Sequence, residues 1–146
     1  MKTLLIYLVF SLIPFAHLSA AGFSGKEPTP KKQNKSSIQF GTASYYHSKF
    51  QGRKTANGEK FDQQKMTAAH NSLPFGTWIR VTNLRNKRSV VVRVNDRLHP
   101  KNKRLVDLSR KAAGELGYIG RGLAKVKVEV LGDKMPEEMS MNKAVK

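Results

Sequence analysis

The chain has 146 residues, enough for one ordinary domain with tails, and its 27 Lys and Arg against 10 Asp and Glu give a formal net charge of +17. It contains no cysteine, which excludes disulfide bonds and a lipid-modified cysteine. So strong a positive charge attracts polyanions or serves solubility alone, and it carries no information about the fold.

Residues 1–21 have the layout of a secretory signal peptide. A positive charge precedes an apolar run over residues 4–15, and small residues follow it. The run is shorter than the ~20 apolar residues that a membrane-spanning helix needs, and Pro14 interrupts it. We expect cleavage after Ala20 or Ala21; a buried N-terminal helix and a retained anchor are the alternatives.

Two polar segments flank a central region that we expect to be the single domain, residues 37–131. Residues 22–36 are basic and contain two prolines, which predicts a flexible linker. Residues 132–146 present no continuous apolar face, which predicts a disordered tail.

Strand patterns dominate the predicted domain. Residues 78–83 alternate apolar with polar side chains, and the β-branched run 89–95 follows after a short turn, so the two should form a hairpin. Residues 125–131 alternate most regularly, with Val and charged residues on opposite faces. Residues 38–46 are a further strand candidate, weakened by Gly41.

Two short helices are expected between these strands. The first begins at Asp62 and runs towards His70; the second covers residues 110–116, with Asp107 or Ser109 as its N-cap. Several short strands, little helix and no long amphipathic segment predict an all-β fold, a small barrel whose closure removes exposed sheet edges.

Acidic residues are few in the predicted domain, so each is informative. They are Glu59, Asp62, Asp96, Asp107, Glu115 and Glu129. The last two are expected on the solvated faces of a helix and a strand, whereas Asp62 and Asp107 are explained as helix caps. Glu59 and Asp96 remain as functional candidates.

Each of these two carboxylates has a plainer interpretation. Glu59 follows the turn signal Asn57-Gly58, where a solvated charge is common. Asp96 lies where a buried strand meets a loop, a place that presents side chains to ligands, but an Asx turn or an ion pair with Arg97 would also explain it.

His70 is an acid–base or orienting candidate, although a lone histidine at a helix end more often packs or caps. The four histidines, at positions 17, 47, 70 and 99, form no close pair, so no metal site is predicted. Neither a nucleophile-elbow serine nor a dinucleotide-binding glycine motif is present, and we expect no cofactor.

Several motifs occur in a characteristic order along the predicted domain. They are GTASYY (41–46), GRKTANGEKFD (52–62), TAAHNSLPFGT (67–77), WIRVTN (78–83), SVVVRVNDR (89–97), RLVDLS (104–109) and residues 112–117. Together they resemble the rare lipoprotein A family over essentially all of residues 38–131.

This resemblance implies a six-stranded double-psi β-barrel, a fold shared with expansins, with one or two short helices. It also implies an endolytic lytic transglycosylase of peptidoglycan. Such an enzyme cleaves between N-acetylmuramic acid and N-acetylglucosamine, prefers glycan without stem peptides, and leaves 1,6-anhydro products. Carried over by motif, the functional residues are Glu59 in TANGE, His70 in TAAH and Asp96 in VNDR.

Within that resemblance we assign Asp96 as the group that acts first as acid and then as base. Glu59 would be the second carboxylate, with His70 hydrogen-bonded to one of the two. The reverse assignment of the carboxylates stays open. Tyr46, Thr55 and Asn95 are predicted substrate contacts in the groove, with Tyr46 as a platform for a sugar ring.

The sequence departs from the family in two ways that bear on function. It lacks the lipid-modified cysteine, so we expect an exported protein of the periplasm or the cell exterior that is not lipid-anchored. Residues 98–103, LHPKNK, replace the family's usual Gly-Pro turn beside Asp96. That change motivates an alternative function, a non-catalytic module that binds glycan as expansins do.

The expected partner is the peptidoglycan glycan strand, with electrostatic contact to an anionic wall or membrane surface and a monomeric state. Charge alone also suggests a nucleic-acid binder. The export signal and the lack of aromatic residues among the basic ones argue against specific nucleic-acid recognition.

Overall fold

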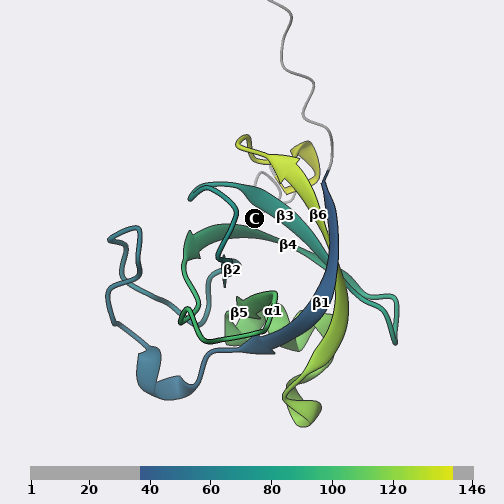
Figure 1. The fold of residues 1–146 in the computed structure, drawn as a ribbon, viewed down its shortest axis with the longest axis horizontal. Helices are drawn as coiled ribbons and strands as arrows, with labels where there is room; N and C mark the ends of the chain where they lie inside the picture. The colour runs from purple at the N-terminus through teal and green to yellow at the C-terminus, as the bar shows by residue number, and fades with distance from the viewer. Residues whose placement is uncertain (1–36, 140–146) are drawn as a thin grey trace, which may run out of the picture. The chain divides into compact units, whose positions relative to one another are not determined.

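The computed structural model describes residues 37–139, which form one closed β-barrel (Figure 1). Its elements in chain order are β1 (Ile38–Tyr45), η1 (Ser48–Phe50), β2 (Thr67–Ala69), β3 (Trp78–Asn83), β4 (Ser89–Asp96), β5 (Val106–Leu108), α1 (Arg110–Leu116), η2 (Ile119–Arg121) and β6 (Ala124–Gly132). The predicted signal peptide and linker, residues 1–36, lie outside the described residues, as do residues 140–146.

Six strands close the barrel in the order β1-β5-β2-β4-β3-β6. The pairs β1–β5 and β2–β4 are parallel, whereas β1–β6, β3–β6, β3–β4 and β2–β5 are antiparallel. The predicted six-stranded barrel is therefore confirmed. The predicted hairpin is also present as β3 and β4, in which Ile79 pairs with Val92.

The core lies inside the barrel because the strands alternate as their sequences indicate. Val126 and Val128 of β6 are fully buried, and so are Val92 and Val94 of β4. The intervening Lys125 and Lys127 face outward at exposed and half-buried positions. This alternation is the period of two that a half-buried strand requires.

The second predicted helix is correct and becomes α1. The hydroxyl of Ser109 accepts from the N–H of Ala112 at 3.3 Å, so Ser109 is the N-cap. Gly117 ends the helix in the left-handed conformation, with φ of 77°, and its N–H donates to Ala113 O. Asp107 is not a cap, contrary to that alternative, because it lies within β5.

The first predicted helix is wrong. Asp62 Oδ1 accepts from the N–H of Gln64 at 3.0 Å and closes a short turn, after which Thr67–Ala69 form β2. All three residues of β2 are buried between β4 and β5, so ladder hydrogen bonds outweigh the helix propensity of the two alanines.

The described residues of the predicted tail, 132–139, contact the barrel. Gly132, the first residue of the predicted tail, is the last residue of β6, and Arg80 of β3 donates to Glu138 Oε1 at 2.6 Å. Within residues 37–139, no helix is long and apolar enough to cross a bilayer.

Candidate active site

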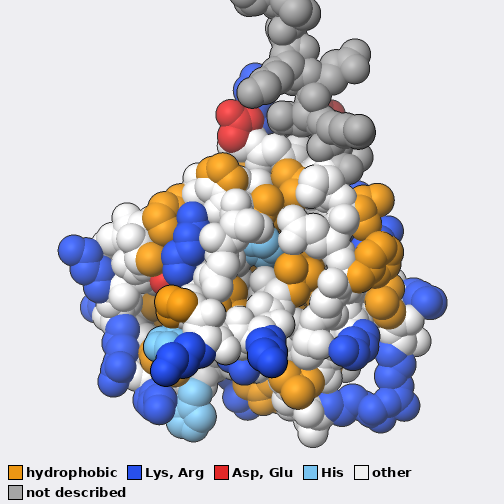
Figure 2. Space-filling view, viewed as in Figure 1, with side chains coloured by type: hydrophobic (Ala, Val, Ile, Leu, Met, Phe, Trp, Pro, Cys, Tyr) orange, Lys and Arg blue, Asp and Glu red, His pale blue; other side chains and the backbone are white. Residues whose placement is uncertain are grey.

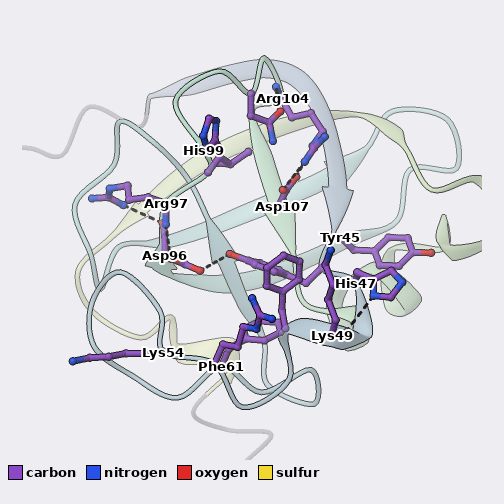
Figure 3. Close-up of a pocket in the computed structure, with 15 residues that line it drawn as sticks. Tyr45, His47, Lys49, Lys54, Phe61, Asp96, Arg97, His99, Arg104 and Asp107 are labelled. Atoms are coloured by element: carbon purple, nitrogen blue, oxygen red, sulfur yellow. Dashed lines mark hydrogen bonds and ion pairs between the residues drawn. The ribbon is translucent and has the colours of Figure 1, made fainter.

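A groove of about 680 Å³ opens beside the carboxyl ends of β1 and β4. Its walls come from the end of β1 with η1, from the loop around residues 53–61, from Asp96 with the loop after it, and from β5. Figure 3 shows Asp96 and Asp107 on different strands facing into this groove, whereas the side chains of Lys54 and Arg97 extend away from it.

Asp96, the last residue of β4, is held in the groove wall by three donors. Its Oδ1 accepts from the backbone N–H groups of Ala56 and Arg97, each at 2.8 Å. Its Oδ2 accepts from the hydroxyl of Tyr46 at 2.6 Å. A carboxylate oxygen offers two lone pairs, so Oδ1 is saturated and Oδ2 keeps one position open towards the groove.

The ion pair with Arg97, one of the plainer alternatives for Asp96, does not form. Arg97 Nη1 instead donates to the backbone oxygens of His70 at 2.8 Å and of Asp96 at 3.2 Å. Its guanidinium also lies 3.8 Å from the ring centroid of Phe75. These contacts turn the cation away from the carboxylate.

Burial is the main reason that the pKa of Tyr46 is far above its ordinary value, and the hydrogen bond to Asp96 is the second. The phenol therefore stays protonated and donates to Asp96. The ring packs against Phe61, with centroids 4.4 Å apart, and against Phe50 at 5.7 Å. Tyr46 thus lies in the groove as predicted and positions Asp96. Its role as a platform for a sugar ring stays a prediction.

Glu59 is anchored in a different environment from Asp96. Its Oε1 lies 2.6 Å from Arg93 Nη2, and its Oε2 accepts from Asn95 Nδ2 at 3.1 Å. The bond to Arg93 is the main reason that the pKa of Glu59 is below its usual range. Glu59 does not line the groove, so the structure does not bring the two predicted carboxylates together in one cavity.

Thr55 and Asn95 are 5% and 3% exposed, and neither lines the groove. The Thr55 hydroxyl donates to Asn57 Oδ1 at 2.6 Å within the turn that carries Glu59. Asn95 holds the Glu59 carboxylate itself. Both residues are thus bonded to Glu59, and their predicted contact with substrate stays a prediction.

A β-bulge in β4 separates the surroundings of neighbouring residues. Val94 pairs with Ala68 of β2, and Asp96 pairs with the next residue, Ala69, so Asn95 is an extra residue in the ladder. Bulges of this kind redirect side chains near functional sites. Here Val94 enters the core, Asn95 contacts Glu59, and Asp96 reaches the groove.

His70 is buried, and its side chain is hydrogen-bonded to the loop that follows it and not to a carboxylate. Its Nδ1 accepts from the backbone N–H groups of Ser72 and Leu73, both at 3.3 Å, which places the ring proton on Nε2. Within residues 37–139, Nε2 has no hydrogen-bond partner. The predicted bond from His70 to Glu59 or Asp96 is therefore absent from residues 37–139, because Nδ1 bonds the loop and Nε2 reaches neither carboxylate.

The electrostatics of His70 support a positioning role. Burial lowers the pKa of its imidazole, so the ring is neutral at neutral pH. The backbone of His70 supports the corner beside the groove, because its N–H donates to Asp96 O at 3.1 Å and its carbonyl accepts from Arg97.

Asp107 is the groove residue that the sequence interpretation missed. It lies on β5 with its side chain 15% exposed, and both its oxygens pair with Arg104, at 2.7 and 2.9 Å. This pairing raises the pKa of Arg104. Two signals in the sequence pointed to it: Asp107 alternates with apolar Val106 and Leu108, and Ser109 already supplies a cap.

The groove also contains an aromatic and cationic wall that no motif indicated. Lys49 Nζ lies 5.5 Å, and the Arg53 guanidinium 5.3 Å, from the ring centroid of Phe50. Aromatic faces suit the apolar faces of sugar rings, and the cations suit anionic ligands. In the part of the chain that the structure describes, no cluster of three His, Asp or Glu side chains is suited to hold a metal ion.

Comparison with known proteins identifies relatives of this domain. A family model described as "Lytic transglycolase" matches residues 38–128. The chain is 50% identical over 109 residues to the endolytic peptidoglycan transglycosylase RlpA of Haemophilus influenzae, which covers 73% of this chain and 38% of that protein. A protein of the same name from Neisseria meningitidis is 43% identical over 122 residues, 84% of this chain and 51% of its own length.

Solved structures agree with the fold. An expansin of Clavibacter michiganensis superposes with a TM-score of 0.55 at 24% identity, over 68% of this chain and 53% of that one. The Streptomyces papain inhibitor gives a TM-score of 0.52 at 21% identity, over 64% of this chain and 94% of that one. The chain spans 38% and 51% of the length of the two RlpA proteins, about half or less.

Proposed function

Because the chain belongs to the lytic transglycolase family of double-psi β-barrels, we propose that its domain is an endolytic lytic transglycosylase of peptidoglycan. The substrate bond would join N-acetylmuramic acid to N-acetylglucosamine in glycan without stem peptides. The observation that carries the proposal is Asp96, which three donors hold in the wall of a groove with aromatic lining and whose Oδ2 has one lone pair that these donors do not use.

The proposed reaction uses Asp96 Oδ2 twice. As an acid it donates a proton to the glycosidic oxygen, and the bond from that oxygen to the anomeric carbon breaks. The C6 hydroxyl oxygen of the same sugar then bonds to the anomeric carbon, and its proton returns to Oδ2. One proton leaves the carboxyl group and one returns, so the reaction consumes no water and yields a 1,6-anhydro sugar.

Other groups support this step through charge and position. Asp107, paired with Arg104, adds a second carboxylate in the groove, where it can stabilise the positive charge that builds on the sugar ring. Glu59 and His70 act through the elements that they hold: Glu59 fixes the turn that presents Ala56 N–H to Asp96, and His70 fixes the backbone of Asp96.

The charge of the groove supports an anionic glycan strand as the ligand. Where the stem peptide has been removed, each lactyl group of the strand carries a free carboxylate. Lys49 and Arg53 lie over the Phe50 ring without an ion pair in residues 37–139, so they complement an anionic strand more than a neutral one.

The test is digestion of purified stem-peptide-free glycan by wild type, Glu59→Gln and Asp96→Asn in parallel, with detection of anhydro-muramyl products. We expect products from wild type and none above background from Asp96→Asn. A wild type that releases no anhydro product, where a known lytic transglycosylase does, would refute the proposal.

A glycan-binding module without cleavage is the second candidate. It is favoured by the loop after Asp96, because His99 and Asn102 line the groove where the family usually has a Gly-Pro turn. This alternative predicts that Asp96→Asn keeps both glycan binding and function in cells. Retained binding with lost function would reject it.

We also propose that the protein is exported to the periplasm or the cell exterior without a lipid anchor, on the signal pattern of residues 1–21. N-terminal sequencing of the protein recovered from cells tests this, and we expect a chain that begins after Ala20 or Ala21. A cell-associated chain that retains residue 1 would contradict it. The monomeric state and the absence of specific nucleic-acid recognition stay predictions.

A further inference from the structure

A second basic surface lies where the β3–β4 turn meets the segment between α1 and β6. Leu84 N–H donates to Lys125 O at 2.9 Å, which joins the β3–β4 turn to the start of β6. Between them is a hollow of about 330 Å³, lined by three cationic residues, Arg85, Arg121 and Lys125, and by no carboxylate. It shares no lining residue with the groove that contains Asp96.

The arginines of this surface are not neutralised by the rest of the domain. Within residues 37–139, the guanidinium groups of Arg85, Arg88 and Arg121 make no hydrogen bond or ion pair. Arg88 belongs to the same cluster, because a Cβ placed on Gly117 of the hollow would lie 2.9 Å from its Nη1. Figure 2 shows Lys and Arg side chains, and no acidic ones, along the lower right edge, where these segments lie in Figure 1.

Exposed apolar side chains accompany these cations. Leu123 lines the hollow and is 52% exposed. Phe40 of β1 is 68% exposed and pairs with Lys127, which follows Lys125 on the same outward side of β6. Clustered cations bind phosphates, and the aliphatic side chain of Leu123, unlike the Phe40 ring, offers no flat face to the sugars of an anionic glycan. A lipid interface accommodates both kinds of side chain.

We propose that Arg85, Arg88, Arg121, Leu123, Lys125 and Phe40 form a docking surface for an anionic phospholipid bilayer. The cations contact head-group phosphates, and Leu123 and Phe40 enter the interface. Because this surface shares no residue with the groove, the proposal is independent of the proposed enzymatic function.

The experiment measures binding of the full chain to vesicles of phosphatidylcholine with and without phosphatidylglycerol. The test variant is Arg85→Gln/Arg121→Gln/Lys125→Gln. The matched control, Lys65→Gln/Lys103→Gln/Lys111→Gln, removes the same charge at exposed positions elsewhere. Any contribution of residues 1–36 is common to all chains, and thermal unfolding checks that each variant folds.

Each cation near an anionic bilayer contributes roughly fivefold to binding, so the test variant should bind phosphatidylglycerol vesicles on the order of 100-fold more weakly than wild type. The control should bind within a few-fold of wild type. Leu123→Ser should weaken binding by about tenfold, because it removes an apolar group from the interface.

Two results would overturn the proposal. Equal binding by the test variant and the control would show that net charge, and not this surface, attracts the vesicles. Unchanged binding by Leu123→Ser, together with competition by soluble anionic glycan, would assign the surface to a polymer instead of a bilayer.

Discussion

Asp96 is the last residue of β4, and Glu59 is held by two other residues of that strand, Arg93 and Asn95, yet the environments of the two carboxylates differ. Glu59 faces a cation, Arg93, and its pKa is lowered mainly by that bond. Asp96 meets only neutral donors, two backbone N–H groups and the Tyr46 hydroxyl. The cation therefore favours the charged form of Glu59, whereas no cation is bonded to the carboxylate of Asp96. This difference supports the proposal that Asp96 transfers the proton and that Glu59 holds the turn beside it.

Among the variants that test this comparison, Asp96→Asn should lower glycan cleavage the most. The amide oxygen can keep both backbone bonds, and Tyr46 can accept from the amide nitrogen, so the fold should survive. Loss of the proton-transfer group should lower glycan cleavage by about 1000-fold. Product release per enzyme measures it, with thermal unfolding as the control. Activity near that of wild type would remove Asp96 from the proposed mechanism.

His70→Ala should destabilise the domain by about 2 kcal/mol, because the N–H groups of Ser72 and Leu73 would lose their acceptor. His70→Asn should recover much of this, since its amide oxygen can take the place of Nδ1. Urea unfolding measures both variants. The activity of His70→Asn should follow the same pH profile as wild type, and a profile that loses one titration would instead show that His70 transfers a proton.

The contribution of neutral His70 to the stability of the domain depends on pH. Its folded pKa is below the unfolded value, so its contribution to stability is complete above about pH 6.5 and is lost as pH falls through the folded pKa.

Tyr46→Phe tests the neutral donor directly. It removes the bond to Asp96 Oδ2 but keeps the ring that packs on Phe61. We expect cleavage to fall by about tenfold, because Asp96 loses one of its three donors. The free energy of unfolding should fall by about 1.5–3 kcal/mol, the usual contribution of a hydrogen bond to a charged group. A loss as large as that of Asp96→Asn would move the proton-transfer role towards Tyr46.

Glu59→Gln should give the smallest effect, a change in how stability depends on pH. Because the folded pKa of Glu59 is lowered, its ion pair stabilises the protein above about pH 4.3, and this is lost as pH falls through the folded pKa. The carboxylate is 38% exposed, so solvent screening limits the contribution to about 0.5 kcal/mol. Urea unfolding at neutral and acidic pH should show this loss in wild type and not in Glu59→Gln.

The sequence predicted the strands whose alternation is regular, such as β6, because burial on one face leaves a period of two. It missed β2, whose residues are all buried and so show no alternation. Glu59 and Asp96 were identified by their motifs, but their separation into two environments depends on Arg93 and on a bulge, which are tertiary features. Asp107 was misassigned because an acid before a helix also fits a cap.

The bulge in β4 matters for any attempt to transplant this site. Three consecutive residues have three different environments. Val94 lies in the core, Asn95 donates to Glu59, and Asp96 lines the groove. A regular strand would return Val94 and Asp96 to the same face. A designer who grafts Asp96, Tyr46 and the turn at residues 55–59 onto another barrel must therefore graft the bulged pairing as well. If the same three residues paired regularly, the acid would lie on the same face as Val94, in the interior.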